Sequence, residues 1–113
     1  MIREGAPLDF IKEAIMKYPG HLDDPVDENG STLVIVAVFN GRVEVAEQLL
    51  IRKANINKAD NDGNTALHHA CHQNFKQCIE LLITAGADES IMNDMRIRPW
   101  ELQDGGLNEQ DNY

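Results

Sequence analysis

The stretch from Asp27 to Lys53 is repeated from Asp60 to Gly86, and this repetition constrains the fold more than any other feature of the sequence. Five framework residues recur 33 positions later: Asp27, Gly30, Thr32, Val34 and Ala37 correspond to Asp60, Gly63, Thr65, Leu67 and Ala70. A unit of this length cannot bury its apolar face alone, so it gains stability by stacking on its neighbours. We therefore expect an array in which one kind of unit is repeated and stacked. The exposed residues that differ between the units should form a recognition surface.

Length and charge limit the class of protein. At 113 residues and 42% hydrophobic, the chain is expected to form one domain with a modest core. No apolar stretch approaches the ~20 residues of a membrane span, and the first five residues lack the apolar core of a signal peptide. A net charge of −9 repels nucleic-acid backbones and anionic lipid, so the expected partner is a protein with a basic segment.

The chain has two cysteines, Cys71 and Cys78, which are too few for the disulfide framework of a small secreted scaffold. Their number favours a reducing compartment. We therefore predict a cytoplasmic or nuclear protein in which both thiols fill core space.

Apolar spacing predicts a helical hairpin in the first repeat. Ser31 or Thr32 can cap a short helix that runs through Val34 to Val38, and the turn formers Asn40 and Gly41 end it. A second helix with an apolar inner stripe follows from Val43 to Leu50. The β-branched run Val34 to Val38 considered alone favours a buried strand, but its counterpart Leu67 to Cys71 has weak strand character, so the repeat favours a helix.

The second repeat predicts the same hairpin. One helix is expected from Thr65 to about His72 and another from Phe75 to about Ala85, where Gly86 stops it. The residues between the two hairpins, Asn55 to Gly63, are rich in turn formers and should project as a β-turn.

Partial units are expected on both sides of the two repeats. Leu8 to Ile15 shows the apolar stripe of one helix, which should end before Pro19. A third register begins at Asn93, with Arg96 in the place of the glycine, and one last short helix is expected from Pro99 to about Asp104.

These residues resemble a known family. The run Asp60 to Ala70, followed by Glu80 to Asp88, closely resembles the ankyrin-repeat consensus, whose core reads threonine, proline, leucine, histidine, any residue, alanine. The first repeat is a weaker match, with Leu33 in place of the proline, Ile35 in place of the histidine and Lys53 in place of the turn glycine.

The resemblance implies an all-α solenoid of stacked helix-turn-helix units joined by β-turn fingers. It divides a single 1–113 domain into a partial repeat (7–26), two full repeats (27–59 and 60–92), a partial repeat (93–104) and a frayed tail (105–113). Such a short stack is near the lower limit of stability, so the partial units should act as caps.

The resemblance further implies a non-enzymatic protein-binding module that needs no cofactor. In this family, partners usually lie against the turn tips and the exposed face of the first helices. Carried onto this sequence residue by residue, those positions are Glu28, Asn29, Ser31, Phe39 and Asn40 in the first unit, Asn61, Asp62, Asn64, His72 and Gln73 in the second, and Asp94, Met95 and Ile97 in the third.

Two features of this surface allow alternatives. Phe39 is either an aromatic anchor for a partner or a residue packed on the N-terminal helix. Glu28, Asp62 and Asp94 either favour a basic segment or form a merely solvated acidic surface.

A metal-binding regulatory module is the alternative function. His68, Cys71 and His72 form the densest group of possible zinc ligands, although one helix face cannot present four ligands in tetrahedral geometry. The resemblance instead makes His68 a structural histidine. A calcium loop at Asp60 to Gly63 is disfavoured because Lys58 and His69 would take ligand positions that neither can serve.

Catalysis needs a concave pocket, and two stacked repeats leave little room for one. We therefore expect no enzymatic activity. A further reading is that so short a stack self-associates, although a monomer is the expected state.

Overall fold

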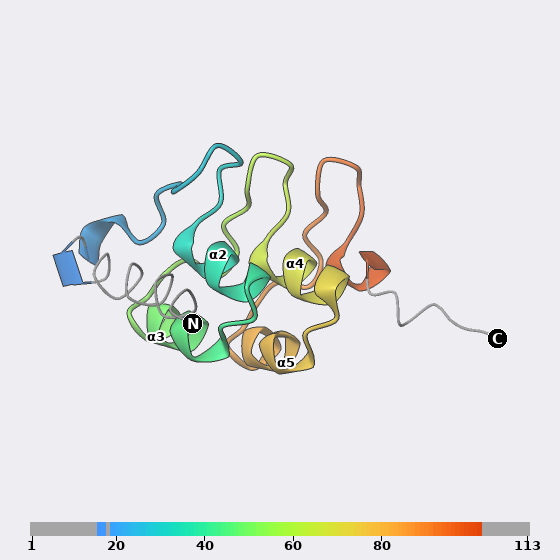
Figure 1. The fold of residues 1–113 in the computed structure, drawn as a ribbon. Helices are drawn as coiled ribbons and strands as arrows, with labels where there is room; N and C mark the ends of the chain where they lie inside the picture. The colour runs from blue at the N-terminus through green and yellow to red at the C-terminus, as the bar shows by residue number, and fades with distance from the viewer. Residues whose placement is uncertain (1–15, 18, 103–113) are drawn as a thin grey trace.

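The computed structural model describes residues 16–17 and 19–102. The helix expected from Leu8 to Ile15 and the tail from residue 105 onward lie outside the described residues. Within residues 19–102, four α-helices form two layers, with α2 (Leu33–Phe39) and α4 (Ala66–Gln73) in one layer and α3 (Val43–Ile51) and α5 (Lys76–Thr84) in the other. Three loops stand side by side above these layers, one before each first helix (Figure 1). No strand occurs within the described range, which confirms the all-α class.

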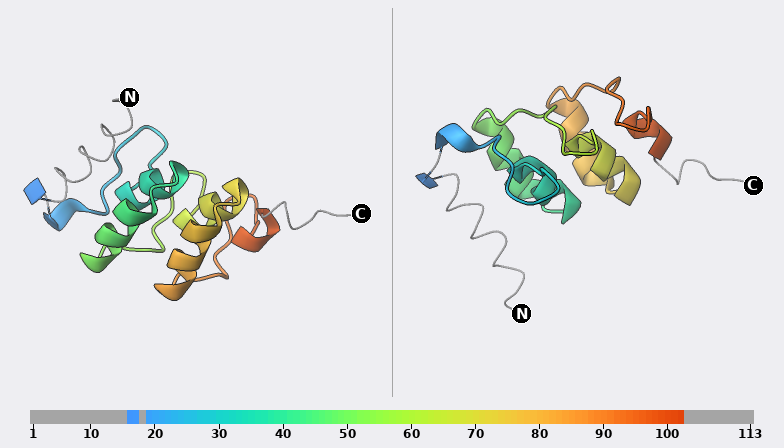
Figure 2. Two further views of the ribbon diagram at one scale, coloured as in Figure 1. Left: turned by 60° about the horizontal axis from the view of Figure 1, so that its bottom comes forward. Right: turned by 90° about the horizontal axis from the view of Figure 1, so that it is seen from above.

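Each repeat forms the expected hairpin. α2 packs against α3 and α4 packs against α5, and the two hairpins lie beside each other along the stack (Figure 2). Short 3-10 helices stand at the two ends of the described stack, η2 (Pro19–His21) and η3 (Pro99–Leu102). The last helix was expected to reach about residue 104. Its described part is a single 3-10 turn that ends at Leu102, and the two residues after it lie outside the described range.

Threonines start both first helices. The Thr32 side chain accepts a hydrogen bond from the amide of Ile35 at 3.2 Å, which identifies Thr32 and not Ser31 as the cap of α2. Thr65 caps α4 in the same way, by accepting from the amide of His68. A capping hydroxyl satisfies an amide that the first helical turn leaves without a partner, so both threonines fix where their helices begin.

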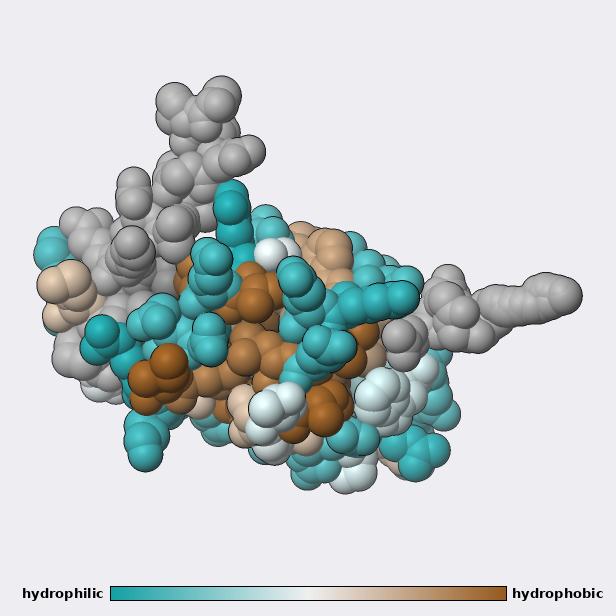
Figure 3. All heavy atoms as spheres, turned by 90° about the horizontal axis from the view of Figure 1, so that it is seen from below, coloured by the Kyte–Doolittle hydropathy of each residue, from teal (hydrophilic) through white to brown (hydrophobic). Residues whose placement is uncertain are grey.

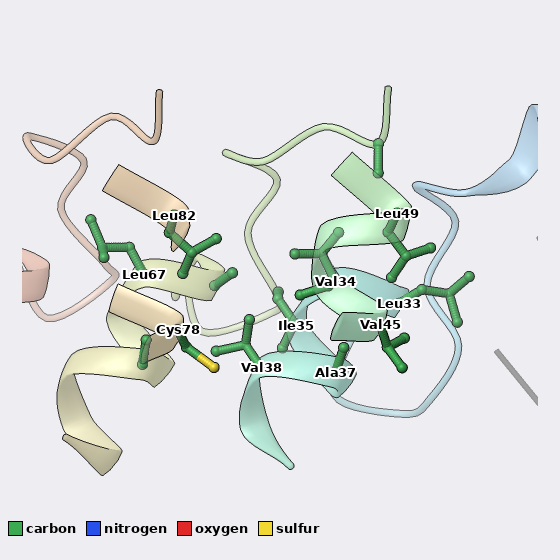
Figure 4. Packing of buried hydrophobic residues seen from close by; sticks show 14 of the residues in the cluster. Leu33, Val34, Ile35, Ala37, Val38, Val45, Leu49, Leu67, Cys78 and Leu82 are labelled. Carbon is green, nitrogen blue, oxygen red and sulfur yellow. The ribbon is translucent and has the colours of Figure 1, made fainter. Parts of the chain in front are cut away.

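The β-branched run of the first repeat is helical, because tertiary packing outweighs its strand propensity. Val34, Ile35 and Val38 are each no more than 2% exposed. They belong to one buried cluster that continues through both hairpins, with Leu49 of α3 and Leu82 of α5 inside it (Figure 4). Each fully buried side chain of this size contributes roughly 1.5–3 kcal/mol, more than the small loss in helix propensity.

A row of hydrogen bonds joins the loops that follow the second helices. The amide of Asn55 donates to Oδ1 of Asp23 at 2.7 Å, and the amide of Asp88 donates to Oδ1 of Asn57 at 2.8 Å. These bonds connect segments about one repeat apart. They hold successive units in register.

None of the described helices is both long and apolar enough to cross a membrane.

Candidate protein-binding surface

The three loops above the helices, which we call fingers, are built on one repeated turn. At the base of each finger, Oδ1 of Asp27, Asp60 or Asn93 accepts hydrogen bonds from the backbone amides two and four residues later. A side chain that bonds its own backbone in this way mimics a backbone turn and fixes the loop. The pKa of Asp27 is lowered, chiefly because its carboxylate accepts a hydrogen bond from the amide of Ser31.

Neighbouring fingers are joined through their backbones. The amide of Asn61 in the second finger donates to the carbonyl of Asn29 in the first at 2.8 Å. In the same way, the amide of Asp94 in the third finger donates to the carbonyl of Asp62 at 3.0 Å. The Asn61 side chain adds a bond to the carbonyl of Glu28 at 3.0 Å. The three tips are therefore one continuous edge.

This close approach requires glycine. Gly63 has φ of +80°, and a Cβ there would lie 2.8 Å from the backbone nitrogen of Asp94. Gly30 is equivalent, and a Cβ there would lie 2.3 Å from Oδ1 of Asn61. Arg96 takes the same left-handed conformation in the third finger, with φ of 64°. Its side chain is tolerated because no further finger packs against it within the described residues.

His68 joins the second hairpin to the third finger. It is fully buried, and its Nδ1 accepts a hydrogen bond from the amide of Thr65 at 3.0 Å. The proton is therefore on Nε2, which lies 2.8 Å from the carbonyl of Ile97 and donates to it. Burial lowers the pKa of His68, since the charged ring would lose its hydration and would place a proton against the Thr65 amide.

These contacts rule against the zinc site considered from the sequence. Both ring nitrogens of His68 already have partners, and burial raises the pKa of the Cys71 thiol to about 11, so the thiolate needed by zinc is disfavoured. Cys78 is also buried, which raises its pKa. No group of three or more possible metal ligands occurs among residues 16–17 and 19–102.

An aromatic residue marks the exposed end of the first helices. Phe39, at the last position of α2, is 52% exposed, so more than half of the side chain faces solvent. Its ring meets the ring of His69 edge to face, with centroids 5.8 Å apart and an interplanar angle of 85°. Nε2 of His69 donates in turn to Oδ2 of Asp60 at 2.9 Å. A contact chain thus links the base of the second finger to the aromatic ring on α2.

The sequence-predicted contact residues are not equally accessible. One of them, Ser31, is buried, and three are half-buried, namely Asn64, Gln73 and Ile97. The others are exposed: Glu28, Asn29, Phe39, Asn40, Asn61, Asp62, His72, Asp94 and Met95. Several of them also hold the surface together. The side chain of Gln73 donates to the carbonyl of Phe39 at 3.4 Å, and Oδ1 of Asn64 accepts from the side chain of Asn93 at 2.8 Å.

Sequence reasoning missed His69. The available signal was its position, because the equivalent residue is Val36 in the first repeat, so the second repeat departs from the first at this site. His69 places its ring edge to face against the exposed ring of Phe39.

Replacing Gly63 by alanine should destabilise the protein by about 3 kcal/mol or more. The added Cβ both meets the Asp94 backbone and strains a left-handed residue, which alone costs roughly 1–2 kcal/mol. Gly41→Ala is the matched control, because its φ is +71° but the nearest atom to a Cβ there is 3.6 Å away. Chemical denaturation measures the free energy of unfolding of both variants. Equal losses for the two variants would contradict the close packing of the fingers.

Lowering the pH from about 7.5 to 5.5 should reduce the free energy of unfolding. His68 has a lowered pKa in the folded chain, so its contribution is complete above the ordinary value of 6.5 and is lost as the pH falls below it. One proton limits the slope to about 1.4 kcal/mol per pH unit. Denaturation at several pH values should give a flatter dependence for His68→Gln, while the exposed His72→Gln variant should retain the wild-type slope.

The comparisons with known proteins agree with this geometry. A family described as ankyrin repeats, in three copies, matches residues 1–93. The ankyrin repeat domain of Bcl-3 superposes with a TM-score of 0.76 over 86% of this chain and 44% of that one, at 25% identity. Mouse protein phosphatase 1 regulatory subunit 27 is 32% identical over 81 residues, covering 72% of this chain and 53% of that protein.

Mouse oxysterol-binding protein-related protein 1 is 36% identical over 75 residues, which are 65% of this chain and 8% of that protein. The chain thus spans about half or less of the length of these curated relatives. Ankyrin repeats are protein-interaction modules, and their fold is a non-enzymatic scaffold. By the family match and the shared fold together, the chain belongs to the ankyrin-repeat family.

Proposed function

We propose that this chain is a non-enzymatic protein-binding module, whose partner lies along the finger tips and the exposed ends of α2 and α4. The observation that carries the proposal is Phe39, which is 52% exposed and held by the ring of His69. An aromatic ring that is already oriented loses little conformational freedom on binding, and aromatic residues are enriched among the strongest contacts of interfaces.

The finger edge provides the second half of this surface. Its tips are tied together by backbone hydrogen bonds, so a partner meets a surface that is already ordered. Each finger carries one exposed carboxylate near its tip, namely Glu28, Asp62 and Asp94. On a chain with net charge −9, these carboxylates favour a partner segment that contains lysine or arginine.

The same charge supports two further parts of the proposal. It disfavours nucleic acid and anionic membrane surfaces as partners, and it disfavours self-association, so we expect a monomer. Residence in the cytoplasm or nucleus agrees with two reduced, buried cysteines. The relative that is named a regulatory subunit of protein phosphatase 1 suggests regulation by occupancy, in which the module binds an enzyme or its target and performs no chemistry itself.

Phe39→Ala should weaken binding of the partner by about 30-fold or more, the loss typical of a residue that dominates an interface. The partner is first identified by placing a photo-crosslinking amino acid at position 39 in cells, with position 51 as the reference. Ile51 is also exposed, at 63%, but lies at the end of α3 in the other helix layer. The affinity of the purified partner is then measured for Phe39→Ala and Ile51→Ala.

The control separates binding from folding. Both substitutions remove an exposed apolar side chain, so both variants should unfold at nearly the wild-type temperature. If Phe39→Ala binds as tightly as Ile51→Ala, the proposed surface is rejected. Replacing Glu28, Asp62 and Asp94 by their amides should reduce the salt dependence of association; an unchanged salt dependence would reject the basic segment while leaving the role of Phe39 intact.

A further inference from the structure

The row of fingers has two ends, and each end carries a backbone group of the kind that joins the fingers inside the row. Within the row, the amides of Asn61 and Asp94 are the donors. In the 33-residue register, the next donor is the amide of Glu28 in the first finger, and the next acceptor is the carbonyl of Met95 in the third. Neither of these two groups makes a hydrogen bond with the described residues. The row therefore offers a donor at one end and an acceptor at the other.

These two groups match each other across copies of the chain. A second copy placed end to end would bring the amide of its Glu28 toward the carbonyl of Met95, as a further finger would follow the third. A head-to-tail contact of this kind does not close on itself, so it can continue into a fibre. Edge strands of β-sheets carry the same risk, and natural proteins block them.

Exposed apolar side chains add to this risk. The side chain of Met95, beside the acceptor carbonyl, is 76% exposed. Seen from below, the layer formed by α3 and α5 also shows hydrophobic side chains bordered by hydrophilic ones (Figure 3). Contacts between such surfaces would stabilise an end-to-end pair of chains once the fingers had met.

Charge alone does not prevent a joint between two fingers. The second joint forms between Asp62 and Asp94, which are both exposed aspartates. The net charge of −9 opposes the approach of two copies, but salt screens exposed charges beyond about 8 Å at physiological ionic strength. A stop that acts at contact distance is therefore needed in addition.

Arg96 has the geometry of such a stop. A glycine occupies the equivalent place in the other two fingers, and a Cβ on Gly63 would lie 2.8 Å from the backbone nitrogen of Asp94. Arg96 keeps the same left-handed backbone, with φ of 64°, but it carries a Cβ. The finger of a second copy would meet that Cβ before its Glu28 amide reached the carbonyl of Met95.

The conformation of Arg96 supports an active role over mere tolerance. A left-handed residue with a side chain is strained, whereas glycine adopts the same φ without steric cost. The Arg96 side chain is exposed and makes no hydrogen bond or ion pair with the described residues, so no such contact offsets the strain. A glycine at this position would relieve the strain and would also open the end of the row.

We propose that Arg96 ends the row of fingers, because its Cβ prevents a second copy of the chain from joining head to tail through the amide of Glu28. The row itself defines the excluded occupant, since the first finger repeats the turn of the second and third. This inference goes beyond the proposed function, because it concerns the end of the row and holds whether or not a partner binds along it.

The test joins two full copies in one chain, with a flexible linker from the end of the first copy to the start of the second. Such a link raises the local concentration of each copy to about the millimolar range. The readout is hydrogen exchange of the Glu28 amide in the second copy, which is protected when it bonds the carbonyl of Met95 in the first. With Arg96→Gly in the first copy, this exchange should slow at least ~3-fold relative to the unchanged tandem.

Arg96→Ala in the first copy is the matched control. Alanine removes the charge and the length of the side chain but keeps the Cβ, so the Glu28 amide of the second copy should exchange as fast as in the unchanged tandem. Fast exchange with Arg96→Gly, slow exchange with Arg96→Ala, or slow exchange in the unchanged tandem would each overturn the proposal.

Sedimentation of single copies checks the donor. The Arg96→Gly chain should form larger species as its concentration rises. Adding Glu28→Pro should return it to a monomer, because proline lacks the donor amide and suits the second position of the turn from Asp27 to Gly30. An Arg96→Gly chain that stays monomeric at every concentration, or an assembly that persists with Glu28→Pro, would contradict a contact through the ends of the row.

Discussion

The close approach of each finger to the one before it is the constraint on which the rest of the structure depends. The amides of Asn61 and Asp94 reach the preceding finger only because Gly30 and Gly63 have no side chain at the point of contact. Once the fingers are joined, the first helices that follow them are held side by side, and α2 and α4 can share one buried cluster. The spacing of the fingers thus fixes the spacing of the binding surface.

Much of this could be predicted from the sequence, because the informative residues act locally or recur at a fixed interval. Thr32 and Thr65 act within a few residues of themselves, so the helix starts were predictable. The strand propensity of Val34 to Val38 was outweighed by the match to the second repeat, and the helical outcome confirms that the repeat was the better guide. The 3-10 form of the described part of η3 was not predicted, because Pro99 in a first turn suits a short helix of either kind.

The surface contacts were harder to predict, because they depend on distances between elements. The chain from Asp60 through His69 to Phe39 joins a finger base to two helices, and no motif encodes it. Ser31 matched a surface position by family resemblance, yet it is buried, with its amide bonded to the Asp27 carboxylate and its carbonyl to the amide of Val26. His68 shows the opposite case. The resemblance gave it a structural role, and its bonds to Thr65 and Ile97 explain that role physically.

Hydrogen exchange of the amides of Asn61 and Asp94 tests the central claim most directly, because these two groups form the joints between fingers. The account predicts that both amides are protected, with opening free energies within about 1 kcal/mol of global unfolding. The amide of Glu28 serves as the reference, since it is in an exposed residue of a finger tip and makes no hydrogen bond within the described part of the chain. Exchange of Asn61 and Asp94 as fast as that of Glu28 would contradict a joined row of fingers.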